Sequence, residues 1–593
     1  MSILNKTIDL SKVYDNKFIK IVINILFCLS TACLTKILIV QKFSTPILDI
    51  ALPCLSFLIM LFVCFKFDFL KKTYTNKHIH YAKSNTIILI ISAILGAYVL
   101  YNIYFFTNEY IKAPPSLLAT LVAIFATITF LYWFYTKLWY YLKLFFKSLD
   151  KMEKNFLIIA TCVFSVAIII IYNLTSVFTA AHIAEEDKKY ILTYSEENEQ
   201  ALAMGQLMKD DVYSVICGNL LFTADTQFII GTDAYNHINA KENDIRQPLF
   251  GLFALPYTIA PKLISDITFE EIYPFLIALV QGFLVFVTII LLEKMMKLQG
   301  ITRLLFMLFL TFTYPTMLFL VNMEQYVIHV FYLVLFIYMV INKIKDKDLL
   351  YILATGTLVT TGLLFPLLGE RKNFKESIKN IFFTFLKFVA ILIISGKIIL
   401  YTPEQLKGQI DNLSIYTSSA SEAIDYATQA NMYTNFAFNT VIAPQIKSEE
   451  GLLASKVMVR DKLTVRIVAY NYKVQQTENT STNVFGLLIL VMVVLGFIFN
   501  RKDAFCKICF TWVLFSVFLL LIVGYGASEN GFILYSYYFS WAFVCLIFRL
   551  FELLLKKWPK IKNTIYTVAI IPMAIINFYG IYQLIIFGIQ YYI

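Results

Sequence analysis

The sequence predicts an all-α polytopic membrane protein. Of its 593 residues, 59% are hydrophobic and only 15% are charged, which excludes a soluble multi-domain enzyme. Apolar runs of about 20 residues, long enough for a helix to cross roughly 30 Å of hydrocarbon, recur along most of the chain. These runs are continuous and do not alternate between apolar and polar residues, so a β-barrel is excluded as well.

Apolar runs bounded by charged residues give thirteen candidate transmembrane helices. The first run is too long for a signal peptide and lacks a small-residue cleavage site, so we expect it to remain in the membrane. We expect the first four runs to form an N-terminal bundle over 1–148 and the others a second module over 149–593. The runs are 18–40, 47–65, 85–106, 116–136, 155–178, 272–293, 303–321, 325–342, 380–401, 484–500, 507–525, 532–552 and 565–590.

The short loops differ in their content of lysine and arginine. With a cytoplasmic N-terminus, the short outer loops hold only Lys42 and Lys112. Cation-rich loops stay in the cytoplasm, so the formal net charge of +11 is an orientation signal, and we expect no nucleic-acid partner. The clusters assigned to the inside include Lys66, Lys71, Lys72 and Lys77; Lys143, Lys147, Lys151 and Lys154; Lys343, Lys345 and Lys347; Arg501 and Lys502; and Lys556, Lys557 and Lys560.

One further apolar run, 349–368, has cations on both flanks. Lys347 precedes it and Arg371 follows it, so both flanks are expected in the cytoplasm. The run is rich in glycine and threonine and contains Pro366. We predict a re-entrant pair of half-helices here, because irregular backbone at membrane depth survives only where protein or a cavity covers it.

Two long polar segments, 179–271 and 402–483, are predicted as large extracytoplasmic loops that carry most of the chemistry. Of nine cysteines, only Cys217 falls in them, so they contain no disulfide framework. The abundance of Lys, Asn, Ile, Tyr and Phe is typical of an AT-rich genome. Together with the missing disulfides, it indicates a bacterial plasma membrane.

The densest group of polar residues lies in the first of these segments. A carboxylate near a membrane surface can remove a proton from a hydroxyl, and a guanidinium can bind a phosphate through two hydrogen bonds. Interleaved aromatic and apolar residues favour a folded loop, although a solvated loop without specific chemistry is the alternative. The candidates are Asp225, Asp233, His237, Lys241 and Arg246.

An outer-loop acid followed by Arg246-Gln247-Pro248-Leu249-Phe250, directly before an apolar stretch, resembles bacterial GT-C glycosyltransferases. The resemblance covers roughly 155–593. It implies an integral membrane enzyme that takes a sugar from a polyprenyl-phosphate carrier and transfers it outside the cytoplasm. Asp225 would be the family's loop acid, but it lies farther from the preceding span than in many members, so Glu185, Glu186, Asp187 and Asp233 remain alternatives. Two further similar pieces are Asn322-Met323-Glu324-Gln325-Tyr326 and Leu534-Tyr535-Ser536-Tyr537-Tyr538-Phe539.

Three smaller signals lie within or beside the apolar runs. Glu324 sits at a tight turn, where a carboxylate costs about 3 kcal/mol unless it is paired, so we expect it to face the protein interior. For His329 we favour a structural interior role over a catalytic one. Lys397, near the outer end of its run, either extends to the interface or binds a lipid phosphate.

Cofactor signals are absent from the sequence. Cys506 and Cys509 have a redox or metal spacing but no second pair and no nearby histidine, so we interpret them as structural. No nucleotide-binding motif occurs. The scheme therefore requires no cofactor and no metal, in agreement with a lipid-linked donor.

The resemblance implies an inverting glycosyltransferase whose partners are a polyprenyl-phosphate-linked sugar donor, a glycan or glycolipid acceptor and membrane lipids. Asp225 would be the base, with Asp233 and Glu324 as alternatives, and Arg246 with Arg460 or Arg466 would neutralise the departing phosphate. His237, Lys241 and Lys397 are further candidates for binding substrate or lipid phosphate. The competing hypotheses are a polysaccharide polymerase or ligase that uses a lipid-pyrophosphate donor, and a lipid or solute transporter or flippase.

Overall fold

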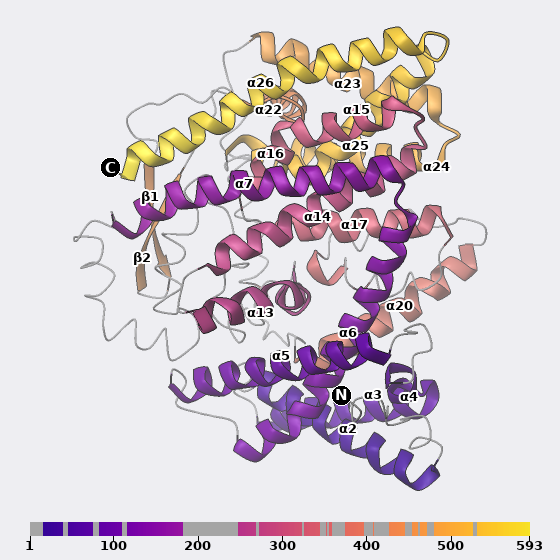
Figure 1. The fold of residues 1–593 in the computed structure, drawn as a ribbon, viewed down its shortest axis with the longest axis vertical. Coiled ribbons are helices and arrows are strands. Elements are labelled where there is room, and N and C mark those ends of the chain that lie inside the picture. Colours follow the sequence, from indigo (N-terminus) through magenta and orange to yellow (C-terminus); the bar gives the residue numbers. More distant parts are fainter. Residues whose placement is uncertain are drawn as a thin grey trace.

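The computed structural model of the chain consists almost entirely of helices in the residues that it describes. One two-stranded hairpin, which the sequence analysis does not anticipate, completes this part of the chain. Many of the long helices, including Lys151–Ala181, Tyr273–Met296 and Pro559–Tyr592, run roughly parallel to one another (Figure 1). The described residues are 16–39, 46–74, 82–109, 116–181, 247–268, 272–322, 325–343, 352, 355–358, 374–396, 407, 426–444, 453–460, 463–470, 480–525 and 530–592.

The helices and strands follow the chain in two groups. The N-terminal group is α2 (Lys17–Ile39), α3 (Pro46–Phe67), α4 (Phe69–Tyr74), α5 (Ala82–Glu109) and α6 (Leu117–Ser148). The second group is α7 (Lys151–Ala181), α13 (Phe250–Thr268), α14 (Tyr273–Met296), α15 (Ile301–Phe312), α16 (Tyr314–Val321), α17 (Gln325–Ile341), α20 (Phe374–Ile394), α22 (Tyr426–Asn439), β1 (Leu453–Arg460), β2 (Leu463–Tyr470), α23 (Thr480–Asn500), α24 (Ala504–Ser516), the π-helix η2 (Val517–Ile522), the 3-10 helix η3 (Asn530–Tyr535), α25 (Ser536–Leu554) and α26 (Pro559–Tyr592).

The helix lengths establish a multi-pass membrane protein. Ten described helices are long and apolar enough to cross a membrane, and the pair α15 and α16, bent by 61°, gives eleven if it forms one span. The apolar helices Gln325–Ile341 and Phe382–Ile394 are shorter. All thirteen predicted runs overlap these helices, whereas α4, α13 and α22 lie outside the runs. Of the predicted re-entrant run, the structure describes only Ile352 and 355–358, so the re-entrant pair stays a prediction.

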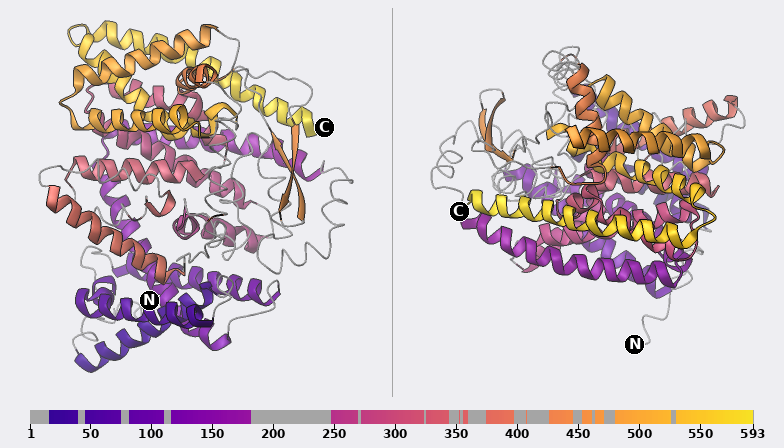
Figure 2. Two further views of the ribbon diagram at one scale, coloured as in Figure 1. Left: turned by 180° about the vertical axis from the view of Figure 1, so that it is seen from behind. Right: turned by 90° about the horizontal axis from the view of Figure 1, so that it is seen from above.

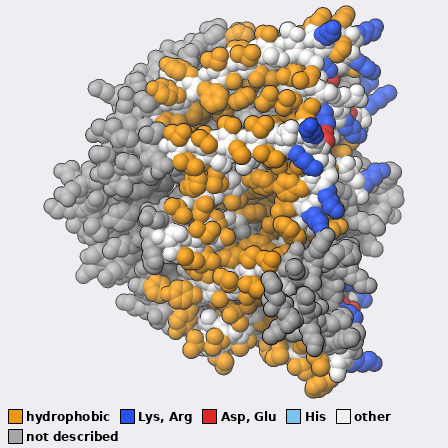
Figure 3. Space-filling model, in the orientation of Figure 1, with side chains coloured by type: hydrophobic (Ala, Val, Ile, Leu, Met, Phe, Trp, Pro, Cys, Tyr) orange, Lys and Arg blue, Asp and Glu red, His pale blue; other side chains and the backbone are white. Residues whose placement is uncertain are grey.

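The two ends of the long helices differ in charge. Lys and Arg side chains gather at one end, and hydrophobic side chains cover much of the surface beside it (Figure 3). This is the end at which α7 and α26 begin, while the β1–β2 hairpin and the C-terminus lie toward the other end (Figures 1 and 2). Because cation-rich loops stay in the cytoplasm, we keep the prediction that the cationic end faces inward.

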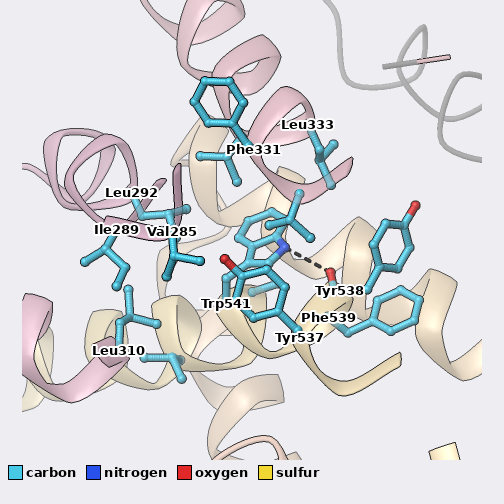
Figure 4. Packing of buried hydrophobic residues seen from close by; sticks show 14 of the residues in the cluster. Val285, Ile289, Leu292, Leu310, Phe331, Leu333, Tyr537, Tyr538, Phe539 and Trp541 are labelled. Atoms are coloured by element: carbon cyan, nitrogen blue, oxygen red, sulfur yellow. Dashed lines mark hydrogen bonds between the residues drawn. The ribbon is translucent and has the colours of Figure 1, made fainter. Parts of the chain in front are cut away.

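The core of the second group lies where α14, α15, α17 and α25 pack together (Figure 4). Tyr538 anchors this packing through its backbone carbonyl, which accepts hydrogen bonds from the indole N–H groups of Trp512 (2.9 Å) and Trp541 (3.0 Å). Trp512 belongs to α24, so the shared carbonyl fastens α24 to α25. Buried indole N–H groups normally find such a partner.

The N-terminal bundle packs against α13 and α20 of the second group. Leu255 and Ile259 of α13 belong to the same buried cluster as residues of α2, α5 and α6. The Thr35 hydroxyl donates to the carbonyl of Ile394 at the end of α20 (2.8 Å), and the Tyr98 hydroxyl donates to Asp266 of α13. The two groups are therefore packed against each other in the described part of the chain.

A network of ion pairs joins α7, α14 and α15 at the cationic end. The Arg303 guanidinium contacts Glu293 (2.6 Å), Glu153 (2.8 Å) and Asp150. Lys294 adds a second cation, 2.9 Å from Glu153. The side chains of Glu153 and Glu293 are only 1% and 2% exposed, so both carboxylates depend on these partners.

Asp150 and Glu153 also cap the start of α7. The Asp150 N–H donates to the Glu153 carboxylate (2.8 Å), and the Glu153 N–H donates to the Asp150 carboxylate (2.9 Å), a reciprocal capping box. Desolvation alone would raise the pKa of Asp150. The backbone N–H of Glu153 and the Arg303 guanidinium outweigh it and hold this pKa below its ordinary value.

Thiol labelling can test the orientation. We place single cysteines in a cysteine-free variant by Tyr426→Cys, at a side chain 80% exposed in α22, and by Lys502→Cys, at an exposed side chain of the cationic end. In intact cells, a membrane-impermeant maleimide should label position 426 but not position 502. Labelling of 502 without permeabilisation would contradict the predicted sidedness.

The ion-pair network should be a major contributor to stability. Arg303→Gln leaves two buried carboxylates with one cation, which should destabilise the fold by about 3 kcal/mol. We expect the melting temperature of the purified protein in detergent to fall by several degrees. Arg501→Gln, at an exposed arginine of the same end, is the control and should change little. Equal shifts for the two variants would show that the network does not hold these helices.

Candidate functional site

Three segments that are far apart in the sequence meet in the interior of the second group. The Phe250 ring contacts His329 (5.5 Å between centroids), and Tyr326 contacts His329 (5.9 Å). Tyr326 also contacts Tyr535 (6.0 Å) and Tyr538 (6.2 Å). The start of α13, the start of α17 and the junction of η3 with α25 therefore form one site. We call it the junction site, comprising Gln247, Leu249, Phe250, Asn322, Gln325, Tyr326, His329, Thr355, Gly356, Tyr535 and Tyr538.

A backbone hydrogen bond fixes the entry into α13. The Leu249 N–H donates to the carbonyl of Gly356 (2.8 Å), which lies in the otherwise little-described run 349–368. A side chain at Gly356 would place its Cβ 2.8 Å from Leu249 and 2.6 Å from Phe253. Only glycine permits this approach, because real Cβ contacts are not that short. The glycine-rich composition noted in the sequence thus corresponds to a close contact with the junction site.

Several uncharged polar side chains are buried at the junction site. Gln247, Asn322 and Thr355 are all buried, and each has a side-chain N or O atom with no hydrogen-bond partner among the described residues. Leaving such a group unpaired costs about 1–3 kcal/mol. Buried polar atoms of this kind are normally satisfied, so these mark positions that a polar ligand or ordered water can complete.

Gln281 of α14 fixes the end of α16 beside the site. Its side-chain N–H group donates to the carbonyl oxygens of Asn322 (3.3 Å) and Phe319 (3.5 Å). The last carbonyls of a helix have no partner within the helix, and the apolar interior offers no water to replace one. Gln281 therefore holds the end of α16, at Phe319 and Asn322, at a defined position.

The short helix α22 packs on a distorted stretch of the chain next to the site. It runs roughly perpendicular to the long helices (Figures 1 and 2). Gln429 donates to the carbonyl of Leu520 in η2 (3.3 Å), and a hydrogen bond of 2.8 Å joins the hydroxyls of Tyr433 and Ser516. The Tyr525 N–H donates to the carbonyl of Leu519 (3.0 Å) and not to that of Leu520. The Leu520 carbonyl is therefore available to accept from Gln429. Single π-helical turns of this kind occur frequently at functional sites.

Ring contacts connect α22 with the junction site. Phe436 contacts Phe539 (6.4 Å), Phe539 contacts Tyr538 (4.9 Å), and Tyr538 contacts Tyr326 (6.2 Å). Offset and edge-to-face pairs at these distances contribute beyond simple burial. The second polar segment, which contains α22, is thereby packed onto the same site as α13 from the first.

Most of the charged residues predicted for the site lie outside the described residues. Arg460 and Arg466 are described as backbone positions of the hairpin, where Arg460 pairs with Leu463 and Arg466 with Val457. The described members of the junction site are uncharged at neutral pH, apart from the titratable His329. The predicted residues outside the description are Asp225, Asp233, His237, Lys241, Arg246, Glu324 and Lys397.

The described part of the chain was also compared with the requirements of a metal site and of a reactive thiol pair. It holds no group of three or more His, Cys, Asp or Glu side chains that could bind a metal ion. Cys506 and Cys509 are buried free thiols of α24. The chemistry available at the described junction site is hydrogen bonding by amides and hydroxyls, together with contact against aromatic rings.

Sequence reasoning missed two polar residues that organise this region. Gln281 and Asn577 are buried amides within predicted spans, and both hydrogen-bond to backbone groups of other segments. A lone polar residue in an apolar run was the available signal, because such residues in membranes face the protein interior. From the sequence, charged residues and His329 are the candidates in or beside these runs, whereas the amides are not.

No protein-family model matches the chain, and neither a curated protein nor a solved structure matches it. The resemblance to GT-C glycosyltransferases therefore rests on the motifs given above. Its three pieces are Gln247 to Phe250, Asn322 with Gln325 and Tyr326, and Tyr535 to Phe539. In the structure, all three contribute to the junction site.

The junction site should depend on the fully buried Phe250. Phe250→Ala removes the ring against His329 and leaves a cavity, which should cost roughly 3 kcal/mol and lower the melting temperature by several degrees. Phe383→Ala, at a ring that is 50% exposed on α20, is the matched control and should have little effect. A thermal melt in detergent compares them. If Phe250→Ala melts like the wild type, the site is not packed as described.

Proposed function

We propose that the chain is an inverting membrane glycosyltransferase of the GT-C kind. It would move a sugar from a polyprenyl-phosphate carrier to a cell-envelope glycan or glycolipid at the outer face of a bacterial plasma membrane. The observation that supports this proposal is the meeting of the three motif segments at the junction site. Nothing in their spacing along the sequence required them to be neighbours.

The composition of the junction site suits a sugar at a membrane surface. Binding sites for small molecules are mostly apolar and aromatic, with a few placed polar groups. The junction site combines the aromatic rings of Phe250, Tyr326 and Tyr535 with buried amide and hydroxyl groups. Gln247 and Asn322 offer hydrogen bonds to sugar hydroxyls, while the rings offer apolar faces.

The charged groups of the proposal adjoin these residues in the sequence. Arg246 directly precedes Gln247, and Glu324 directly precedes Gln325. In the proposed reaction, a carboxylate removes the proton of the acceptor hydroxyl, whose oxygen then attacks the anomeric carbon. The bond from that carbon to the phosphate oxygen breaks, and the phosphate leaves with the electron pair. Asp225 is the proposed base, with Asp233 and Glu324 as alternatives.

Cations would stabilise the departing phosphate. Arg246, together with Arg460 or Arg466, is proposed for this role because a guanidinium binds phosphate in a bidentate manner. His237, Lys241 and Lys397 are further proposed contacts to substrate or lipid phosphate. A polymerase or ligase would use the same groups on a lipid pyrophosphate and differs only in the lipid product.

One structural observation favours a second function, the translocation of a lipid or solute. The pair α15 and α16 is bent by 61°. The backbone at Thr313, between the two helices, is extended. Discontinuous helices of this kind form the substrate sites of many transporters. A flippase would need no base and would release no lipid phosphate, which separates the two functions experimentally.

Turnover of defined donors tests the proposal. Purified protein in nanodiscs is incubated with farnesyl-phosphate-linked glucose, mannose or arabinose and with envelope lipid extract, and released farnesyl phosphate is measured. We expect release with one of these donors. Asp225→Asn should lower the rate by roughly 10² to 10⁴ without loss of folding, because loss of a general base has this effect. Arg246→Ala should mainly weaken donor binding.

Asp68→Asn, at a carboxylate that pairs with Lys20 at the cationic end, is the matched control and should keep full activity. Loss in Asp233→Asn or Glu324→Gln but not in Asp225→Asn would move the base within the same enzyme class. Release only from a pyrophosphate donor would favour the ligase. No release from any donor, combined with movement of a labelled lipid between leaflets, would replace the enzyme by a flippase.

A further inference from the structure

The side chain of Asn577, in α26, hydrogen-bonds to the backbone at two places where a helix ends. Its side-chain N–H group donates to the carbonyl oxygens of Phe312 and Val441, both at 2.7 Å. Its side-chain oxygen accepts the Ala443 N–H, also at 2.7 Å. The residue is fully buried in α26. Phe312 is the last residue of α15, and Val441 and Ala443 follow the end of α22.

These breaks in the helices free backbone groups in the buried interior of the protein, where water does not reach them. Thr313 is extended, and Pro315 has no N–H to donate, so the helical ladder stops between α15 and α16. The Tyr314 N–H donates to the carbonyl of Val441 (3.1 Å), and Asn577 takes the freed carbonyl of Phe312. The Asn577 side chain and the Val441 carbonyl thus provide hydrogen-bond partners for the free backbone groups at both helix ends, as burial requires.

Gly580 provides the space for this arrangement. A side chain at Gly580 would place its Cβ 2.6 Å from the Cβ of Ala443. Asn577 and Gly580 are three residues apart and therefore share one face of α26. The 441–443 segment packs against this face. Asn577 holds it by hydrogen bonds, and the missing side chain at Gly580 leaves room for it.

Both held segments lead directly to the junction site. Beyond Thr313, α16 runs to Asn322, which is a member of the site. Before Val441, α22 presents Phe436 to Phe539 and Gln429 to η2. The position of α16 relative to α22 is therefore set at Asn577.

We propose that Asn577 is a positioning residue for the junction site. It fixes the angle at which α16 delivers Asn322, and it fixes α22 against the same site. Its side-chain hydrogen bonds go to backbone groups of Phe312, Val441 and Ala443, so it is proposed to act through these segments. This proposal rests on the proposed glycosyltransferase function for its kinetic consequence but not for its geometry.

Four variants separate positioning from general stability. Asn577→Asp keeps the shape and an acceptor for Ala443, but its carboxylate cannot donate to Phe312 and Val441. Asn577→Ala removes all three hydrogen bonds, and Gly580→Ala crowds the contact with Ala443 without removing any. Ile575→Ala, at a side chain 63% exposed on the same helix, is the control.

The kinetic readout uses farnesyl-phosphate-linked sugar and enzyme normalised to its monodisperse fraction. Asn577→Asp and Asn577→Ala should lower kcat by about 100-fold, because misplacing a reacting group by about 1 Å has this effect, while KM changes by less than about threefold. Gly580→Ala should lower kcat less, and Ile575→Ala should leave both constants unchanged. A loss of activity explained entirely by a smaller folded fraction would overturn the proposal.

A second readout does not depend on activity. Hydrogen–deuterium exchange followed by mass spectrometry should rise in both 313–322 and 440–444 of Asn577→Asp, and it should stay unchanged in the α25–α26 turn. Unchanged exchange in the two segments would overturn the positioning role. If the wild type transfers no sugar but the exchange rises as expected, the positioning stands and the proposed function falls.

Discussion

The structure depends on one constraint, that backbone N–H and C=O groups inside a membrane must be hydrogen-bonded within the protein. Continuous helices meet it by themselves, but this chain interrupts its helices at several points. A side-chain amide from another segment takes over at three of them. Gln281 holds the end of α16, Gln429 holds the carbonyl left over in η2, and Asn577 holds the break after α15. The interruptions are therefore fixed in place, and two of them lie at the two ends of α16, which leads to the junction site.

The two helical groups do not separate cleanly, because one helix packs its side chains into both. The predicted division at 148 follows the sequence, yet α13 gives Leu255 and Ile259 to the interior of the N-terminal bundle and Phe250 to the interior of the second group. Tyr257 of α13 also forms a hydrogen bond of 2.9 Å with Tyr332 of α17. The helix that begins at the junction site, α13, is thus one of the two helices, with α20, against which the bundle packs.

The long helices could be predicted from the sequence because a span is defined by local composition. All thirteen predicted runs overlap described helices, and cationic residues gather at one end of them. In contrast, α22 has polar residues such as Gln429, Asn431 and Asn435 along its length, and only its contacts with η2, η3 and α23 make it a stable helix. The hairpin β1–β2 lies in a segment that the sequence analysis treated only as a loop. The candidate site divides in the same way: charged residues were visible in the sequence, whereas the buried amides gain their role from segments that are distant in the chain.

The ion-pair network has a consequence for the order in which the protein is made. Glu153 stands at the start of α7, but its cations, Lys294 and Arg303, are synthesised much later, with α14 and α15. The Glu153 carboxylate is 1% exposed in the finished protein. While the ribosome is still translating the segment between Glu153 and Lys294, neither cation of this network exists to pair with it. Chains fold from the N-terminus during synthesis, and an unpaired charge is costly to bury. We therefore expect the start of α7 to stay in contact with water until Arg303 has been synthesised. Pairing with Arg303 then allows Glu153 to be buried, so the packing of an early helix depends on a later one.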